Sequence, residues 1–136
     1  QHPTGLATRT AIEAALRMSH VSAAELVHVN AHGVGTIEED AAEAQAIQQV
    51  LGDVPVTAPK SLIGNLDAAC GPVELAISLL AMERNLVPAT INYTEPDPEC
   101  PVNVVTTNQP ASSPAILALS QKITGQSVAL MVSAGD

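Results

Sequence analysis

Tyr93 is the only residue with a Phe, Tyr or Trp side chain in a chain of 136 residues, although 46% of the residues are hydrophobic. The core must therefore be built from Ala, Val, Leu and Ile, which favours helices packed closely against a sheet. The length suits one domain with one core. The composition is typical of a globular protein and not of a disordered one.

The hydrophobic patterns predict helices and strands in alternation, followed by two adjacent strands. Helices are expected over Thr8–Met18, over the acidic stretch 38–52, and from about Ala68 to Arg84, the last of these long and largely buried. Strands are expected at 26–31, within 55–61, and at 103–107, 115–121 and 127–133. This order predicts an α/β fold, a mixed sheet covered by helices, in which 26–31 is a parallel inner strand and the last two strands are antiparallel. The proline-rich residues 87–101 should cross the surface as an ordered loop.

The charge pattern excludes some classes of partner. The formal net charge is −9, and the five Lys and Arg residues are scattered, which argues against a nucleic-acid partner. The net negative charge also makes an acidic protein a poor partner, unless the few Lys and Arg residues cluster or a further segment adds more positive charge. No stretch predicts a membrane span or a signal peptide, so we expect a soluble, cytoplasmic protein that does not bind membranes. Cys70 and Cys100 are interpreted as free thiols.

The stretch HVNAHGVGT, residues 28–36, places His32 directly after an apolar strand and before Gly33 and Gly35. This position puts the imidazole at the end of a sheet, where a structural histidine is the simplest interpretation. His28 and His32 lie too far apart on a strand to hold one metal ion without a third ligand. No Lys-Ser/Thr pair follows the glycines at the spacing of a phosphate-binding P-loop, so a phosphate loop is not predicted. We expect neither a metal nor a cofactor.

Four motifs follow one another along nearly the whole chain. They are VNAHGVGT, the acidic EEDAAEAQAI, PKSLIGNLDAACGPVE and VPATINYTEPDPEC. Together, in this order and spacing, they resemble the C-terminal half of the beta-ketoacyl-acyl carrier protein synthases, the thiolase-fold condensing enzymes of fatty acid and polyketide synthesis. The resemblance implies a thiolase-like half, acyl carrier protein or acyl-CoA thioesters as partners, and a dimeric parent protein.

The resemblance also implies roles for individual residues. His32 matches one of two donors that hold the malonyl thioester oxygen while carbon dioxide leaves, and Asn65 stands at the second donor's position. Lys60 matches a family lysine and Glu74 the glutamate that pairs with it, either as a structural salt bridge or as a catalytic contribution. Thr36, the last residue of the first motif, is expected to support the site.

The chain departs from the family at three places. Asn65 replaces a histidine, so its amide can donate a hydrogen bond but cannot titrate. Val34 replaces a threonine, and TGQS at 124–127 replaces the Gly-Phe-Gly-Gly turn whose phenylalanine gates the acyl pocket. The nucleophilic cysteine of the family belongs to its N-terminal half, and neither Cys70 nor Cys100 suits that role.

Residues 1–136 are therefore interpreted as one beta-ketoacyl synthase C-terminal-like domain, and Gln1 in place of methionine suggests a segment of a longer polypeptide. The family's half begins with a central strand that this chain lacks, so we expect a vacant place between the second and fourth strands of the sheet.

Two functions remain open at this stage. The first is the C-terminal domain of a decarboxylating Claisen condensing enzyme, a 3-oxoacyl-acyl carrier protein synthase-like protein that is inactive as an isolated chain. It would act together with the missing N-terminal half. The second is a non-catalytic partner subunit of the chain-length-factor type, which pairs with a complete synthase. Binding of a carrier protein or acyl chain without chemistry is a third, weaker interpretation.

Overall fold

The computed structural model describes residues 5–113, 115–122 and 124–134. Its main sheet has five strands in the order β4-β2-β1-β6-β7. The strands are β1 (Leu26–Asn30), β2 (Pro55–Thr57), β4 (Asn103–Val104), β6 (Ala115–Lys122) and β7 (Gln126–Val132). All pairs are parallel except β6 with β7, which is antiparallel. The predicted mixed sheet, with an inner parallel strand at 26–30 and a final antiparallel pair, is confirmed.

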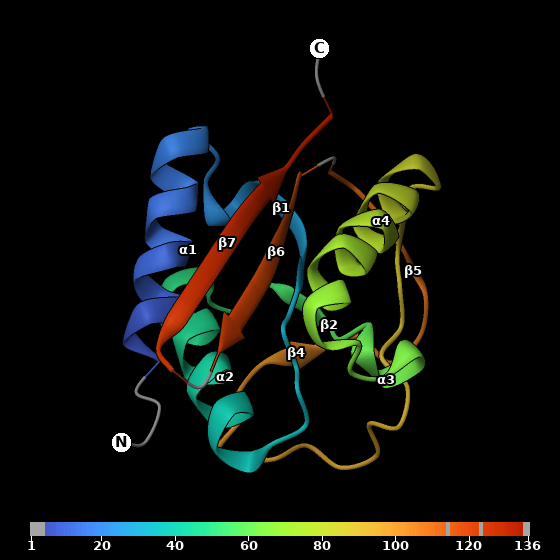
Figure 1. The fold of residues 1–136 in the computed structure, drawn as a ribbon. Helices are drawn as coiled ribbons and strands as arrows, with labels where there is room; N and C mark the ends of the chain where they lie inside the picture. The colour runs from blue at the N-terminus through green and yellow to red at the C-terminus, as the bar shows by residue number, and fades with distance from the viewer. Residues whose placement is uncertain (1–4, 114, 123, 135–136) are drawn as a thin grey trace.

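The helices lie on both faces of this sheet. They are α1 (Leu6–Ser19), α2 (Ile37–Leu51), α3 (Lys60–Ile63) and α4 (Cys70–Glu83), with short 3-10 turns at Ala23–Glu25 and Asp67–Ala69. Figure 1 shows α1 and α2 on one side of the sheet and α4 on the other. A second, two-stranded sheet pairs β3 (Leu86–Val87) with β5 (Gln109–Pro110) beside α4.

Two apolar clusters fill the layers between the helices and the sheet. The larger joins Ile12 of α1 and Ile47 of α2 to Val29 and Leu117 of the central strands, and all four side chains are at most 1% exposed. The smaller lies on the opposite face and includes Val27, with Met82 of α4 packed against it. Aliphatic side chains alone thus build both clusters, as the composition requires.

The predicted vacancy in the sheet is wrong. β1 occupies the central position and pairs with β2 on one side and β6 on the other. The inner strands of the described sheet therefore have a neighbour on each side, and their backbone groups need no further strand between them.

Helix α4 is less buried than its apolar sequence predicts. Its buried residues include Glu74 and Ser78, whereas Leu79 and Leu80 are 51% and 50% exposed. The reason is a polar contact with β1, because the Asn30 side-chain amide donates to the Glu74 carbonyl oxygen and to the Ser78 hydroxyl. The helix turns this polar stripe to the sheet and its leucines outward.

Two other expectations need smaller corrections. The strand predicted at 103–107 is limited to Asn103–Val104, and the strand expected within 55–61 ends at Thr57, so that Lys60 begins the short helix α3. Within the described parts of the chain, no helix is both long and apolar enough to cross a membrane.

Candidate functional site

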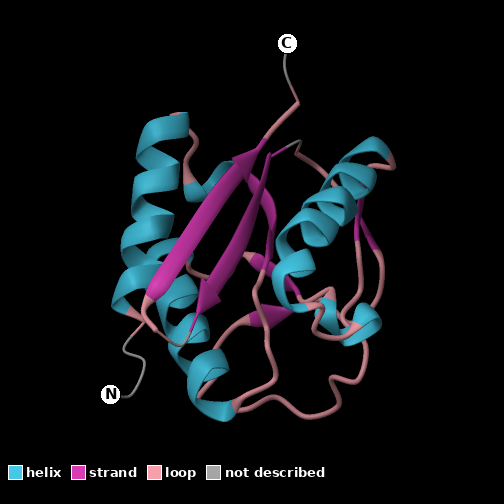
Figure 2. Cartoon of the chain, in the orientation of Figure 1, coloured by secondary structure: helices cyan, strands magenta, loops and turns pink. Residues whose placement is uncertain are grey.

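The strands β1 and β2 end side by side, and the helices that follow them lie on opposite faces of the sheet. After β1 the chain enters α2, which packs into the larger apolar cluster, and after β2 it leads to α4 on the other face. Such a divergence opens a crevice at the carboxyl ends of the strands, where ligands bind in open α/β sheets. In Figure 2 the loop after β1 and the long segment between β3 and β4 run along this end.

A cavity of about 580 Å³ lies at this point. Its walls include the loop 33–36, Lys60 of α3 and Asn65, and its floor is apolar, with Ala44 and Val56 among its residues. His32 is not among the lining residues, although its neighbours Ala31 and Gly33 are. The structure therefore brings the predicted donors to one end of the sheet but places only Asn65 in the cavity wall.

The backbone of His32 is held by Glu43 of α2. One carboxylate oxygen of Glu43 accepts the His32 N–H at 2.7 Å, and the other accepts the Gly33 N–H at 2.9 Å. Glu43 is 3% exposed, and burial raises the pKa of its carboxyl to about 7, while the two N–H donors act in the opposite direction. One buried side chain thus fixes two consecutive peptide groups at the end of β1.

Lys60 holds His32 from the other side. Its Nζ donates to the His32 carbonyl oxygen at 2.6 Å and lies 3.2 Å from Nδ1 of the imidazole. The same Nζ forms a salt bridge of 2.5 Å with Oε1 of Glu74. The predicted approach of Lys60 and Glu74 is therefore confirmed, and the pair reaches His32 directly.

These contacts determine which nitrogen of His32 can donate. Burial and, to a smaller extent, the Lys60 charge lower the pKa of His32 to about 4, against an opposing effect of Glu39, so the imidazole is neutral at pH 7. Because an ammonium is only a donor, Nδ1 must accept from Lys60 and the ring proton resides on Nε2. His32 therefore offers Nε2–H as its one free donor, in the tautomer that the Lys60 contact selects.

Glycine is required next to His32. Gly33 has φ +47°, and a Cβ atom there would lie 3.0 Å from the Cβ of Ala58. The left-handed conformation and the close approach of the β2 end both disfavour any side chain. This glycine lets the chain turn sharply enough for Glu43 to reach both N–H groups.

Asn65 lies at the start of the segment that leads into α4. Its Oδ1 accepts the Asp67 N–H at 3.0 Å and the Cys70 thiol at 3.2 Å. The side-chain N–H₂ has no partner among the described residues and is free to donate. Asn65 thus combines a local structural role with an available donor.

The remaining residues of the loop are held by acidic side chains of α2. The Thr36 hydroxyl donates to Glu39 at 2.9 Å, and the Gly35 N–H lies 3.1 and 3.2 Å from the two carboxylate oxygens of Asp40. Burial raises the pKa of Asp40. Thr36 is exposed and lines the cavity, whereas Val34 adds an apolar wall where the family's threonine would supply a hydroxyl.

Both cysteines are free thiols, as expected. Burial, together with nearby acidic residues such as Asp97, raises the pKa of the Cys100 thiol. Cys70 is 4% exposed and lies at the start of α4. Within the described segments, no group of three or more His, Cys, Asp or Glu side chains is placed to hold a metal ion.

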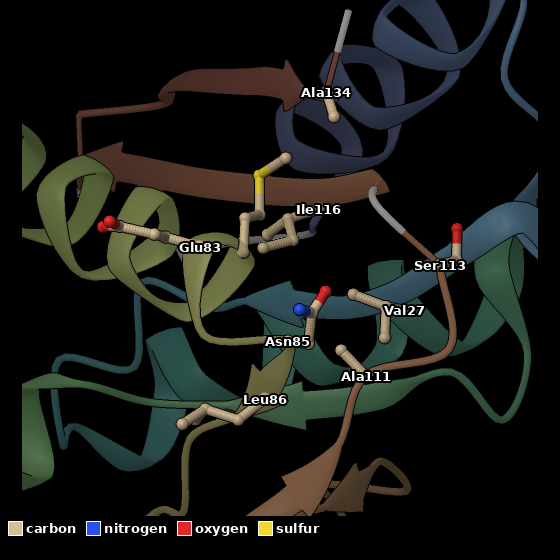
Figure 3. Close-up of a pocket in the computed structure, with 9 residues that line it drawn as sticks. Val27, Glu83, Asn85, Leu86, Ala111, Ser113, Ile116 and Ala134 are labelled. Carbon is tan, nitrogen blue, oxygen red and sulfur yellow. The ribbon is translucent and has the colours of Figure 1, made fainter.

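A smaller cavity of about 220 Å³ lies at the opposite end of the sheet, near the starts of β1 and β6 (Figure 3). Val27, Leu86 and Ile116 make its walls largely apolar, and Asn85 is also part of the wall. None of the predicted site residues lies there.

Glu43 is the main site residue that the sequence interpretation missed. One signal was available, because Glu43 shares a helical face with Ala46 and Ile47, which are both buried. A carboxylate on the apolar face of a helix needs hydrogen-bond donors, and the end of β1 supplies them.

The comparisons with known proteins agree with this arrangement. Residues 1–94 match the family model described as beta-ketoacyl synthase, C-terminal domain. The tetracenomycin polyketide synthase ketoacyl synthase alpha subunit from Streptomyces glaucescens is 43% identical over 107 residues, or 76% of this chain and 25% of the relative. The chain spans about a quarter of the length of the curated relatives it matches.

Solved structures show the same fold. A beta-ketoacyl synthase from Burkholderia phymatum STM815 is similar with a TM-score of 0.93 and 28% identity, covering 100% of this chain and 34% of its own. The ketosynthase ApeO in complex with its chain length factor ApeC, from Xenorhabdus doucetiae, is similar with a TM-score of 0.91 and 30% sequence identity. The match covers 98% of this chain and 35% of the other. The fold is the thiolase-like fold of ketosynthases, and the chain belongs to the family of beta-ketoacyl synthase C-terminal domains.

Proposed function

We propose that the chain is the C-terminal domain of a protein that binds acyl or malonyl thioesters and takes part in their decarboxylating Claisen condensation in polyketide or fatty acid synthesis. The observation that carries this proposal is the contact of Lys60 with Nδ1 of His32. It leaves Nε2–H as a donor of fixed tautomer. The second donor is the free side-chain N–H₂ of Asn65.

The chemistry needs such donors. When a malonyl thioester loses carbon dioxide, the bonding electron pair moves to the α-carbon and is delocalised onto the thioester oxygen, which becomes an enolate oxygen. Preorganised N–H groups that point at this oxygen stabilise the developing charge. Two neutral donors suit this task, because His32 and Asn65 need no proton transfer to act.

The arrangement of side chains supports a second domain that completes the site. Leu79 and Leu80 of α4 are about half exposed, and Leu62 of α3 and Leu66, which follows α3, are 58% and 40% exposed. Several exposed leucines on α3, on α4 and on the segment between them favour contact with another protein surface. The ketosynthase relative seen with its chain length factor supports a partner of this class. Catalysis would require a nucleophile from the family's N-terminal half or from a complete synthase, not from a partner of the chain-length-factor type.

A second function is favoured by a different observation. Val34 removes a hydroxyl from the cavity wall, and the turn at 124–127 carries no phenylalanine. Both changes suit a non-catalytic subunit of the chain-length-factor type, which would shape the pocket of a complete synthase. The two functions differ in one test. In an assembly that contains this chain, His32→Ala abolishes condensation if the chain is catalytic, but alters only the product length if it is a partner subunit.

Thioester recognition is tested with two matched small molecules, S-acetyl-N-acetylcysteamine and S-ethyl-N-acetylcysteamine, which differ by the thioester carbonyl oxygen. We expect the first to shift the NMR signals of the His32 ring and the Asn65 side-chain amide, and the second to leave them unchanged. Asn65→Asp is the matched variant, since it keeps the acceptor oxygen but loses the donor, and it should weaken the effect. Equal shifts with both molecules would contradict the proposal.

A further inference from the structure

Cys70 contacts the proposed donor Asn65 through a buried thiol. Its Sγ accepts the Leu66 N–H at 3.1 Å and donates to Oδ1 of Asn65 at 3.2 Å. Both hydrogen-bonding capacities of the thiol are therefore used, one on the backbone and one on the amide. Cys70 is 4% exposed, so bulk water does not compete for the hydrogen bonds of its thiol.

The same oxygen of Asn65 also accepts the Asp67 N–H at 3.0 Å. A backbone N–H can only donate, so this contact identifies the acceptor end of the amide independently of the thiol. Asp67 adopts the left-handed conformation with φ 51°, which is uncommon for a residue other than glycine. The turn therefore directs the Asp67 N–H toward Asn65, and two donors converge on one oxygen.

An otherwise exposed amide gains a fixed direction from this arrangement. Asn65 is an exposed residue, and a free asparagine side chain on the surface samples several orientations. With Oδ1 held on the side of α4, the N–H₂ end is the polar group left for the cavity that Asn65 lines. A donor acts well on an oxyanion only when its direction is set in advance.

We propose that Cys70 is a positioning residue that holds the Asn65 amide with its N–H₂ toward the cavity at the ends of β1 and β2. The thiol neither touches the ligand nor acts as a nucleophile. This inference rests on the proposed function for the use made of the donor, but the orientation of the amide is a separate property that can be measured without a ligand.

The experiment follows the Asn65 side-chain N–H₂ by NMR in the wild-type chain, in Cys70→Ala and in Cys70→Ser. The hydroxyl of serine can donate to Oδ1 and accept from Leu66 as the thiol does. We expect the side-chain order parameter of Asn65 to fall below about 0.6 in Cys70→Ala and to return toward the wild-type value in Cys70→Ser. Cys100→Ala, the matched change at the other cysteine, should leave it unchanged.

Binding of S-acetyl-N-acetylcysteamine gives the second measurement. Loss of one hydrogen bond predicts roughly fivefold weaker binding in Cys70→Ala and binding within about twofold of wild type in Cys70→Ser. An Asn65 side chain as ordered in Cys70→Ala as in the wild type would overturn the positioning role. So would an absence of rescue by Cys70→Ser in a variant whose thermal midpoint matches the wild type.

The two proposals fail in different ways. If the wild-type chain shows no response to the thioester, the proposed function fails, while the order parameters still decide whether Cys70 positions Asn65. If Asn65→Asp weakens thioester binding but Cys70→Ala does not, the donor role stands and the positioning role is overturned.

Discussion

Glu74 accepts a hydrogen bond of 2.5 Å from Lys60, and the side chains of the two residues are only 3% and 4% exposed. Burial raises the pKa of Glu74, and the contact with Lys60 opposes that shift. A buried pair of this kind is costly to break from one side only, because the remaining charge loses its partner. The pair joins α3 to α4 and, through Lys60, reaches His32.

Lys60→Met should therefore lower the free energy of unfolding by about 3–5 kcal/mol, measured by urea denaturation. The double variant Lys60→Met with Glu74→Leu should recover most of this loss, because no unpaired charge remains. Glu13→Gln, in the exposed pair with Arg9 at 3.8 Å, is the control and should change stability by less than about 0.5 kcal/mol. A double variant as unstable as Lys60→Met would contradict a pairing origin for the loss. In either Lys60 variant, ¹⁵N NMR should show that the ring proton of His32 is no longer confined to Nε2.

Glu43→Gln should loosen the loop after β1. The amide keeps one acceptor but turns an N–H₂ toward one of the two backbone donors, so one hydrogen bond becomes a repulsive contact. We expect a loss of about 1–3 kcal/mol in the free energy of unfolding near pH 4.5 and below, where the folded chain holds Glu43 as the neutral acid, and faster amide hydrogen exchange at His32 and Gly33. Glu83→Gln, at an exposed position, should leave both exchange rates unchanged.

The same variant has a defined pH dependence. The pKa of Glu43 is raised to about 7 from 4.5, so the unfolded chain releases this proton first as the pH rises. Wild-type stability should fall through the window from pH 4.5 to 7 by up to about 3 kcal/mol from this group, and no further above it. Glu43→Gln lacks this contribution. If the stability of the wild type and that of Glu43→Gln changed with pH in the same way, the pKa of Glu43 would not be raised in the folded chain.

His28 should change the stability of the chain with pH in the opposite direction from Glu43. It is 1% exposed on β1, neither ring nitrogen has a hydrogen-bond partner among the residues that the structure describes, and burial lowers its pKa to about 4 from 6.5. The neutral imidazole is favoured in the folded chain, so its contribution is complete above pH 6.5 and is lost as the pH falls toward 4. The loss should reach about 3 kcal/mol. His28→Leu should remove this acid sensitivity and leave the chain at least as stable at pH 7, since the unpartnered nitrogens disappear.

Thermal or urea unfolding between pH 4 and 7.5 measures the effect. His20→Leu, at an exposed position, is the control and should keep the wild-type profile. Because Glu43 and His28 act in opposite directions between pH 4.5 and 6.5, the wild-type curve alone is flatter than either contribution. The difference between each variant and the wild type is therefore the informative quantity.

The order of elements and the main sheet could be predicted from sequence because the signals are local. The apolar stretch ending in Gly33 and Gly35 defines β1 and its turn, and the short connection between β6 and β7 leaves room only for an antiparallel pair. The inner position of β1 was predicted, but the identity of its two neighbours was not predictable in this way. It depends on pairing with β2 and β6, which are distant in sequence.

The site was only partly predictable for a related reason. The pairing of Lys60 with Glu74 followed from the resemblance and is confirmed by the geometry. The buried role of Glu43 and the bond between Cys70 and Asn65 were missed, because each depends on how a side chain meets backbone groups of another segment. The hydrophobic pattern predicted the helix α4 but overestimated its burial, because the polar stripe that faces the sheet depends on hydrogen bonds from Asn30 and on the Lys60 contact with Glu74.

Residues 1–136 by themselves lack a thiol that could carry an acyl group. Neither thiol is suited to form an acyl-enzyme, since the pKa of Cys100 is raised by burial and by acidic neighbours, and Cys70 is buried with its hydrogen bonds in use. Asn65 lines the cavity at this end of the sheet and His32 lies beside it, and water that enters an open cavity weakens the stabilisation of a developing charge. We therefore expect residues 1–136 alone neither to condense acyl thioesters nor to decarboxylate malonyl-acyl carrier protein above the buffer rate.

Carbon dioxide release from malonyl-acyl carrier protein tests this expectation, with His32→Ala as the control. Both chains should match the buffer rate, and both cysteines should react with an acyl-thioester-mimicking electrophile no faster than ordinary thiols. Release well above the buffer rate that disappears in His32→Ala would show that the site is competent without another domain. Decarboxylation would then not require a second domain that supplies a nucleophile and closes the cavity, because His32 and Asn65 alone would have lowered the barrier.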